Sequence, residues 1–301
     1  MSDYLGRAEA PLTDRQWADM DRAVVDVARR TLVGRRLLHV FGPLGPGLQV
    51  APNDRFHGRG MGALDMLGEA DCDEVASAGR VYLPLPILHK DFMVHWRDLE
   101  EALAAGQALD TGAAASAAAY CARLEDELIF NGRPDMGYDG LRNVAGRGTI
   151  QQSDWSAMGN AFRDVTSAVE QLASNGFSGP FAVAVSPRML VAMNRMFENT
   201  GVLEIDQVRK LATAGVFVTP VLPDPSVVVV ATGPENLDLV VGLDMTVAFL
   251  TTDKMNHHFR VLETLLLRIK RPEAICTIEG VYAAPEVELP AETSAGRRGR
   301  R

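Results

Sequence analysis

The sequence predicts an α+β fold, because helical and strand patterns are both strong and occupy different segments of the chain. Apolar residues recur at helical spacing after residue 13, and an alanine-rich run precedes residue 132. Short valine-rich runs at 181–185, 216–218 and 227–230 are typical of buried strands. With 301 residues, 47% of them apolar, the chain can form a sizeable core.

The first helix is predicted to begin at Thr13. Its hydroxyl can accept a hydrogen bond from a free backbone N–H of the first turn, and Gln16 can reach back to the Thr13 N–H. Gly34 is expected to end this helix. Residues 35–41 are then predicted to form a strand, which stops at the glycine- and proline-rich segment 42–47.

Residues 51–80 contain many Gly, Asp and Arg residues but show little periodicity. We therefore expect an extended arm or long loop with no core of its own. Long ordered loops are uncommon in compact domains unless they have a function, and packing against a neighbouring subunit is one such function.

A second helix is predicted from Thr111 to near Gly132, and it is the longest helix that we predict. Tyr120, Leu124 and Leu128 share one of its faces. The acidic run 125–127 lies on this helix, where consecutive side chains fan out around the axis. We interpret the run as a charged surface that faces solvent or another subunit.

The second half of the chain alternates between helices and strands. Helices are predicted at 155–175 and 187–197, and strands at 237–250 and 258–278 besides the three valine-rich runs. The last of these segments is long enough to be a bent pair of strands or one long ribbon.

The sequence lacks the patterns of a catalytic, cofactor or metal site. The glycines of segment 58–62 do not have the full spacing of a phosphate-binding loop, and no nucleophile motif is present. His257 and His258 would point to opposite faces of a strand, without further ligands at suitable spacing. Trp96 alternates with Phe92 and Val94, which favours a position in the core. We therefore expect neither an enzyme nor a cofactor.

Cysteine usage and charge indicate the compartment and the partners. Cys72, Cys121 and Cys276 are odd in number and far apart, so we expect buried thiols in a reducing environment. The net charge is −9, and it is −12 without the last eleven residues, which hold four arginines against one glutamate. Nucleic acid is therefore not an expected partner. Without a predicted leader or membrane span, we expect a cytoplasmic protein.

Several motifs in a fixed order resemble those of the encapsulins, the shell proteins of bacterial and archaeal nanocompartments. The first lie in segment 10–17, with Trp17 at its end, and in segment 34–45. The motifs that follow are Leu83-Pro84-Leu85, Phe92, the run 125–132, Gly137-x-x-Gly140-Leu141 and Pro272-Glu273-Ala274. Together they extend over nearly all of residues 1–285.

The resemblance implies the fold of tailed-bacteriophage major capsid proteins, with a peripheral domain, an extended loop and an axial domain. The implied boundaries are 1–50 for the N-terminal helix and the start of the peripheral domain, 51–82 for the extended loop, 83–140 for the peripheral domain with its long spine helix, 141–235 for the axial domain, 236–285 for the return to the peripheral domain, and 286–301 for a disordered basic tail.

The resemblance also implies a function and partners. The chain would be a structural subunit that assembles with itself into an icosahedral shell, encloses a cargo enzyme and admits small molecules through axial pores. The cargo would carry a C-terminal targeting peptide, and a ferritin-like protein and a dye-decolourising peroxidase are both candidates. The alternative is a capsid protein of a phage or prophage with the same fold. The naming of some relatives as secreted proteases or bacteriocins finds no support in a leader or a nucleophile motif.

Two sets of site residues follow from the resemblance. Cargo-peptide binding is assigned to Ala28, Leu32, Arg35, Leu37, His39, Ile275 and Ile278. The five-fold pore is assigned to Glu198, Asn199, Thr200, Gly201, Val202 and Leu203. Ala28, His39 and Pro46 depart from the residues frequent in relatives, which implies an unusual cargo peptide. A flavin-binding tryptophan of some relatives lies near the position of Arg97, and Trp96 is offset from it by one residue.

Overall fold

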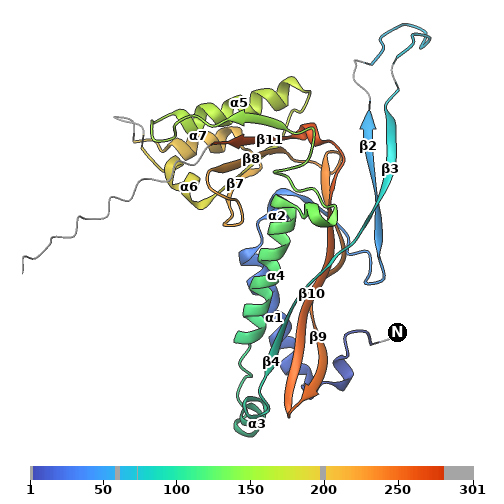
Figure 1. The fold of residues 1–301 in the computed structure, drawn as a ribbon, viewed down its shortest axis with the longest axis vertical. Coiled ribbons are helices and arrows are strands. Elements are labelled where there is room, and N and C mark those ends of the chain that lie inside the picture. The colour runs from blue at the N-terminus through green and yellow to red at the C-terminus, as the bar shows by residue number, and fades with distance from the viewer. Residues whose placement is uncertain (1–2, 58–61, 73, 197–200, 281–301) are drawn as a thin grey trace, which may run out of the picture.

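The computed structural model describes residues 3–57, 62–72, 74–196 and 201–280 (Figure 1). It confirms the α+β class. One part of the molecule is a long body in which two helices lie along a sheet. A second part is a more compact sheet with its own helices, and a narrow two-stranded arm projects beside both.

The long body is built on a four-stranded sheet with the strand order β1-β9-β10-β4. β1 pairs with β9 in parallel, whereas β10 pairs with β9 and β4 in antiparallel fashion. Helices α1 and α4 pack against each other and against this sheet. The bounds are β1 His39–Phe41, β4 Ile87–Val94, β9 Leu237–Asp253, β10 Asn256–Ile269, α1 Asp14–Thr31, α3 Trp96–Ala105, α4 Gly112–Asn131, and the 3-10 turns η1 Arg7–Glu9 and η2 Pro134–Met136.

The predicted start of the first helix is confirmed. Thr13 accepts a hydrogen bond from the Gln16 N–H through its hydroxyl, and the Gln16 side chain accepts one from the Thr13 N–H. The apolar face of α1 then buries Trp17 and Met20, and the Trp17 ring meets Phe259 of β10 edge to face at 5.8 Å. The cap thus fixes where α1 begins, and the aromatic contact fixes which face it turns to the sheet.

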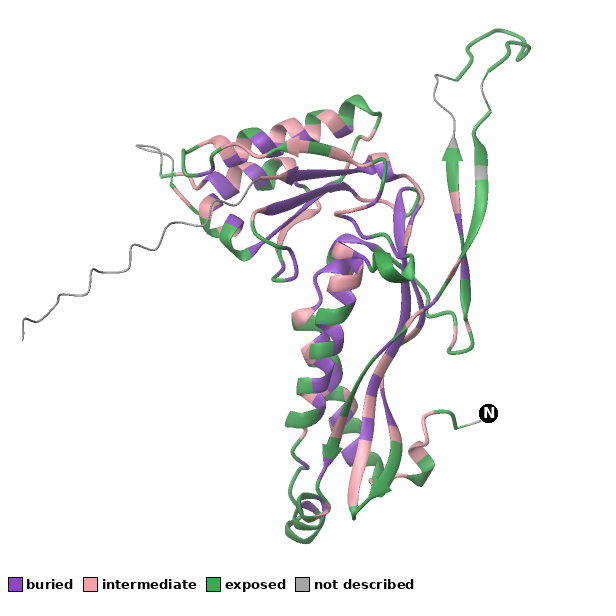
Figure 2. Ribbon diagram, viewed as in Figure 1, coloured by how far each residue is buried: buried purple, intermediate pink, exposed green. Residues whose placement is uncertain are grey.

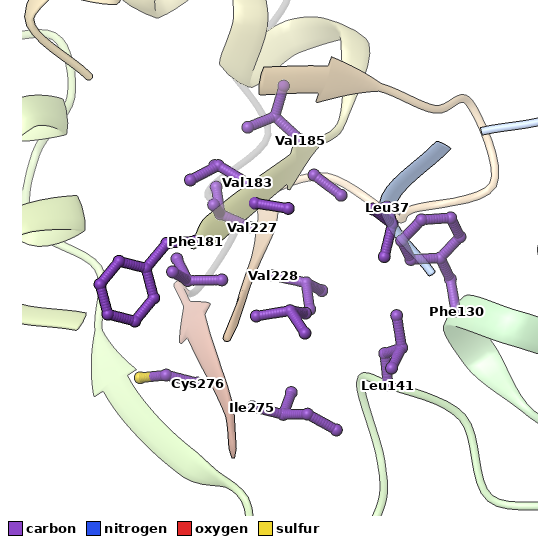
Figure 3. Packing of buried hydrophobic residues seen from close by; sticks show 14 of the residues in the cluster. Leu37, Phe130, Leu141, Phe181, Val183, Val185, Val227, Val228, Ile275 and Cys276 are labelled. Atoms are coloured by element: carbon purple, nitrogen blue, oxygen red, sulfur yellow. The ribbon is translucent and has the colours of Figure 1, made fainter. Parts of the chain in front are cut away.

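The compact part is a five-stranded sheet with the order β5-β11-β8-β6-β7. Figure 3 shows its valines facing Leu37, Phe130 and Leu141, which come from the long body and the turn after α4. One core therefore joins the two parts. The bounds are β5 Gly148–Gln151, β6 Phe181–Val185, β7 Gly215–Val218, β8 Ser226–Ala231, β11 Ile275–Glu279, α5 Asn160–Ser174, α6 Pro187–Met193 and α7 Glu204–Leu211.

The arm consists of β2 (Val50–His57) and β3 (Ala76–Pro84), which pair in antiparallel fashion. Most of its described residues are exposed, as the green of Figure 2 shows. The Leu64 and Met66 residues beyond the strands are 98% and 97% exposed. The sequence did not predict the pairing of β2 with β3. These strands are held together by backbone hydrogen bonds, and they lack the alternating apolar pattern from which strands are predicted.

The region after α1 differs from the prediction. Gly34 does not end α1, which stops at Thr31, but begins the short helix α2 (Gly34–Leu37). Residues 35–41 are therefore not one strand. The reason is tertiary: the Asp126 carboxylate of α4 accepts hydrogen bonds from the backbone N–H groups of Val33 and Gly34, at the start of α2.

Three other predicted elements have different bounds. The helix predicted at 155–175 begins only at Asn160, and the helix predicted at 187–197 ends at Met193. The segment 258–278 is a bent pair of strands, because the turn η3 (Pro272–Ala274) separates β10 from β11. Since β11 joins the five-stranded sheet, the chain returns to the compact part after β9 and β10. The domain boundaries and the tail 286–301, which lies outside the described residues, stay predictions.

Candidate functional site

Two residues of the predicted cargo groove lie together at the C-terminal end of α1, Ala28 within the helix and Leu32 as its C-cap. Ala28 and Leu32 pack on Ala122 of α4 and on Met245, and they are only 7% and 6% exposed. Val25 shares their face of α1, because it precedes them by three and seven residues, and it is 39% exposed. Val25, Ala28 and Leu32 thus form an apolar stripe, and only Val25 leaves part of this stripe exposed to solvent.

Arg35 lies in a network of carboxylates beside this stripe. Its Nε and Nη2 atoms donate to Glu125 Oε1 and Oε2 at 2.7 and 2.8 Å, and Nη2 also donates to Glu263 Oε2 at 2.9 Å. Its Nη1 atom donates to Asp244 Oδ1 at 2.6 Å. Every nitrogen of the guanidinium thus already has a carboxylate partner within the chain.

Two of the three residues of the acidic run on α4 do not face solvent or another subunit as predicted, whereas the third, Glu127, is half-buried. Glu125 is fully buried and Asp126 is 2% exposed. Both lie on the face of α4 that packs against the rest of the fold, where Arg35 and the start of α2 offset their charge. One signal in the sequence indicated this network, since Glu263 is a single acidic residue within the apolar run of its strand.

Burial changes the protonation of these groups. Burial raises the pKa of Asp126 to about 7, although the N–H groups of Gly34 and Val33 act in the opposite direction. Burial raises the pKa of Glu263 well above its usual value, and the charge of Glu125 adds to this effect. The pKa of Arg35 lies above its ordinary value: burial acts to lower it, but the contacts with Glu125, Glu263 and Asp244 together outweigh burial. Arg35 therefore stays charged while Glu263 tends to hold a proton.

The other predicted groove residues do not extend this surface. Leu37 is 4% exposed within the main core, and Ile275 and Ile278 are fully buried there on β11. His39 is exposed at the start of β1. The structure thus brings together Ala28, Leu32 and Arg35, whereas the two isoleucines present no surface to a peptide.

The predicted pore segment is only partly described. Glu198, Asn199 and Thr200 lie outside the described residues. Gly201 is exposed, and Leu203 forms a β-bridge with Met196 just before α7. The described part therefore places the end of the predicted pore segment at the start of α7.

Two expectations about single residues are wrong. Cys72 is exposed, although Cys121 and Cys276 are buried as expected, because the arm provides no core around residue 72. Trp96 is half-buried and begins α3 instead of continuing β4, and the Arg97 guanidinium lies over its ring at 5.5 Å.

Among the described residues, no three His, Cys, Asp or Glu side chains are grouped so that they could hold a metal ion. In the same part of the chain, no helix is both long and apolar enough to span a bilayer.

Comparisons with known proteins point to one family. Residues 1–266 match the protein family described as encapsulating protein for peroxidase. The chain is 49% identical over 283 residues to the type 1 encapsulin shell protein EncA of Myxococcus xanthus, a match that covers 94% of this chain and 99% of EncA.

Solved structures show the same fold. A virus-like particle from Pyrococcus furiosus matches with a TM-score of 0.72 and 23% identity, covering 88% of this chain and 99% of that chain. The capsid of the Myoviridae phage XM1 matches with a TM-score of 0.58 and 12% identity, covering 81% and 90%. The fold expected from the motifs, that of phage capsid proteins, is thereby confirmed.

Proposed function

The chain belongs to the encapsulin family of shell proteins, and we propose that it assembles with copies of itself into an icosahedral nanocompartment that encloses a cargo enzyme. The observation that carries this proposal is the arm. Leu64, Met66 and Leu67 are 98%, 97% and 81% exposed, and none of the three belongs to a hydrophobic cluster of the described residues. Exposed apolar side chains grouped in this way are typical of an interface with another protein.

The position of the arm favours contacts between unlike surfaces of identical subunits. It projects from one side of the molecule (Figure 1), so its tip would meet a different surface on the next copy. Such heterologous contacts form a closed assembly when the repeated rotation from one subunit to the next returns to the first subunit. A closed shell of this kind also explains why the subunit itself would need no catalytic site.

The state of assembly tests this proposal directly. We expect the purified chain to elute as a particle of megadalton size, and to appear as hollow spheres by electron microscopy. A stable monomer or a small ring would contradict the proposal. Particles filled with DNA would instead support a phage capsid protein, which the comparisons relate to this chain by fold alone.

For the cargo, we propose an enzyme whose C-terminal peptide docks along α1 beside Ala28, Leu32 and Arg35, with His39 at its edge. The description of the matching family supports a peroxidase, and the exposed apolar side chain of Val25 on α1 supports an aliphatic anchor in the peptide. Cytoplasmic assembly and a five-fold pore lined by residues 198–203 belong to the same proposal and rest on family membership.

Replacing Val25 with Asp is expected to reduce cargo loading at least about tenfold, while shells still form, because a charge would replace the open apolar part of the docking stripe. Leu32 and Leu37 are less suitable positions for this test, since both are buried and their replacement would disturb folding. Co-purification of cargo with the shell provides the measurement. Val191→Asp is the matched control, because Val191 is 71% exposed on α6. Equal loading in both variants would refute the docking site.

A further inference from the structure

A buried group of charged side chains lies where α2, α4, β9 and β10 meet. Arg35 of α2 contacts Glu125 of α4, Glu263 of β10 and Asp244 of β9. Glu125 and Glu263 are fully buried, whereas the Asp244 side chain is 62% exposed. Figure 1 shows these elements side by side in the long body. The group therefore connects the segment after the N-terminal helix to the sheet.

The charges in this group do not balance. The Asp244 carboxylate is largely in water, so solvent stabilises its charge. The two buried carboxylates share one guanidinium, since Arg35 Nη2 donates to both, and Glu263 Oε1 has no hydrogen-bond partner. With both glutamates ionised, one negative charge in the interior would lack a counter-ion, which is costly in a medium of low dielectric constant.

A single proton would remove this imbalance. Glu125 Oε2 and Glu263 Oε2 accept from the same Arg35 Nη2 atom, at 2.8 and 2.9 Å, and a protonated carboxyl group is an O–H donor. We propose that Glu125 and Glu263 hold one proton between them at neutral pH, and that its loss on the alkaline side loosens the junction between α2 and the sheet. The pair would then make the fold sensitive to alkaline pH, whether or not the chain forms shells.

The groups that face Glu263 from the other elements favour this reading. On α4, burial and then the charge of Glu263 raise the pKa of the Cys121 thiol to about 12, so this neighbour stays neutral. On β4, Leu88 is the register partner of Glu263 and carries no charge. Lys90 and Asp91, farther along β4, act on Cys121 in opposite directions. Arg35 is thus the cation that contacts Glu263, and it also forms ion pairs with Glu125 and Asp244.

The direction of the pH effect follows from linkage. Burial raises the pKa of Glu263 in the folded chain above its unfolded value. The folded state therefore binds this proton more tightly, so the contribution of Glu263 to stability is fully present below its unfolded pKa and is lost as the pH rises through its folded pKa. Asp126 contributes a fall in the same direction, because burial raises its pKa to about 7.

Glu263→Gln tests the shared proton, because glutamine has nearly the shape of a protonated glutamate but cannot lose a proton. For the full-length protein as purified, we expect the midpoint of thermal unfolding to fall as the pH rises from neutral into the alkaline range, and this fall to shrink by at least half in the variant. The matched control is Glu127→Gln, two residues along α4 from Glu125, which should retain the full fall. An unchanged fall in the Glu263 variant would overturn the proposal.

Infrared spectroscopy provides a second measurement that does not depend on how the variant folds. At about pH 8, where Asp126 is mostly ionised, the unmodified protein should show the carbonyl band of a neutral buried carboxylic acid. Glu127→Gln should retain this band. Absence of the band from the unmodified protein would show that both glutamates are ionised, and would refute the proposal even if Glu263→Gln proved insoluble.

Discussion

Replacing Arg35 with methionine is expected to lower the free energy of unfolding by about 3–5 kcal/mol near neutral pH, because removal of one partner leaves buried charge uncompensated. Arg35 is the cation that contacts both Glu125 and Glu263, and neither carboxylate has access to water. Methionine retains much of the aliphatic stem, so the change removes mainly the guanidinium. Denaturant unfolding of the full chain at several pH values provides the measurement.

The neighbouring arginine supplies the control for this prediction. Arg36 is exposed, and its guanidinium donates to the backbone carbonyl oxygens of Arg29 and Arg30 at 3.2 and 3.3 Å. Arg36→Met should therefore cost no more than about 1 kcal/mol. The cost of Arg35→Met should also shrink in acid, where Glu263 is neutral. Equal costs for the two variants would contradict a buried ion network.

Replacing Gly140 with alanine is expected to destabilise the fold by about 3 kcal/mol or more, at the upper end of overpacking. After α4 the chain turns back, and the Leu141 N–H donates to the Ile129 carbonyl oxygen at 2.9 Å. A β-carbon at Gly140 would lie 2.6 Å from the Asn131 carbonyl carbon and 2.7 Å from the Phe130 carbonyl oxygen. These are backbone atoms of α4, so a side-chain movement cannot relieve the clash.

Gly137 in the same turn is the matched control. It has a φ of +80°, but a β-carbon there would meet no atom within 4 Å. Gly137→Ala should therefore cost only the strain of the left-handed backbone, about 1–2 kcal/mol. Thermal unfolding and the yield of soluble protein distinguish the two variants. The same loss in both would show that backbone strain, and not the close approach to α4, limits this turn.

Local signals predicted several elements of the fold correctly. The start of α1 followed from Thr13 and Gln16, whose hydrogen bonds involve only the first turn of one helix. The bent pair of β10 and β11 was one of two alternatives, because the apolar pattern marked both strands but could not show where η3 would separate them. The α2 helix was missed, since Asp126, which binds its first N–H groups, lies about ninety residues away in the chain.

The candidate site was predictable only in part, for a related reason. Ala28, Leu32 and Arg35 were all selected by resemblance, and the helical spacing read from the sequence extended only as far as Ala28. The acidic run on α4 was read as exposed, because most charged helix residues are exposed. Its burial depends on Arg35, which only the packing of α1 and α2 against α4 brings to Glu125.

The sequence by itself determined the α+β class, the position of the arm in the chain and the family, because these depend on local periodicity and on motifs in a fixed order. Only the tertiary structure decided which charges are buried together. A carboxylate can be buried when a cation from a distant segment offsets its charge, and the contact of Arg35 with Glu125 and Glu263 joins residues about ninety and two hundred and thirty positions apart. Local periodicity contains no information about such a contact.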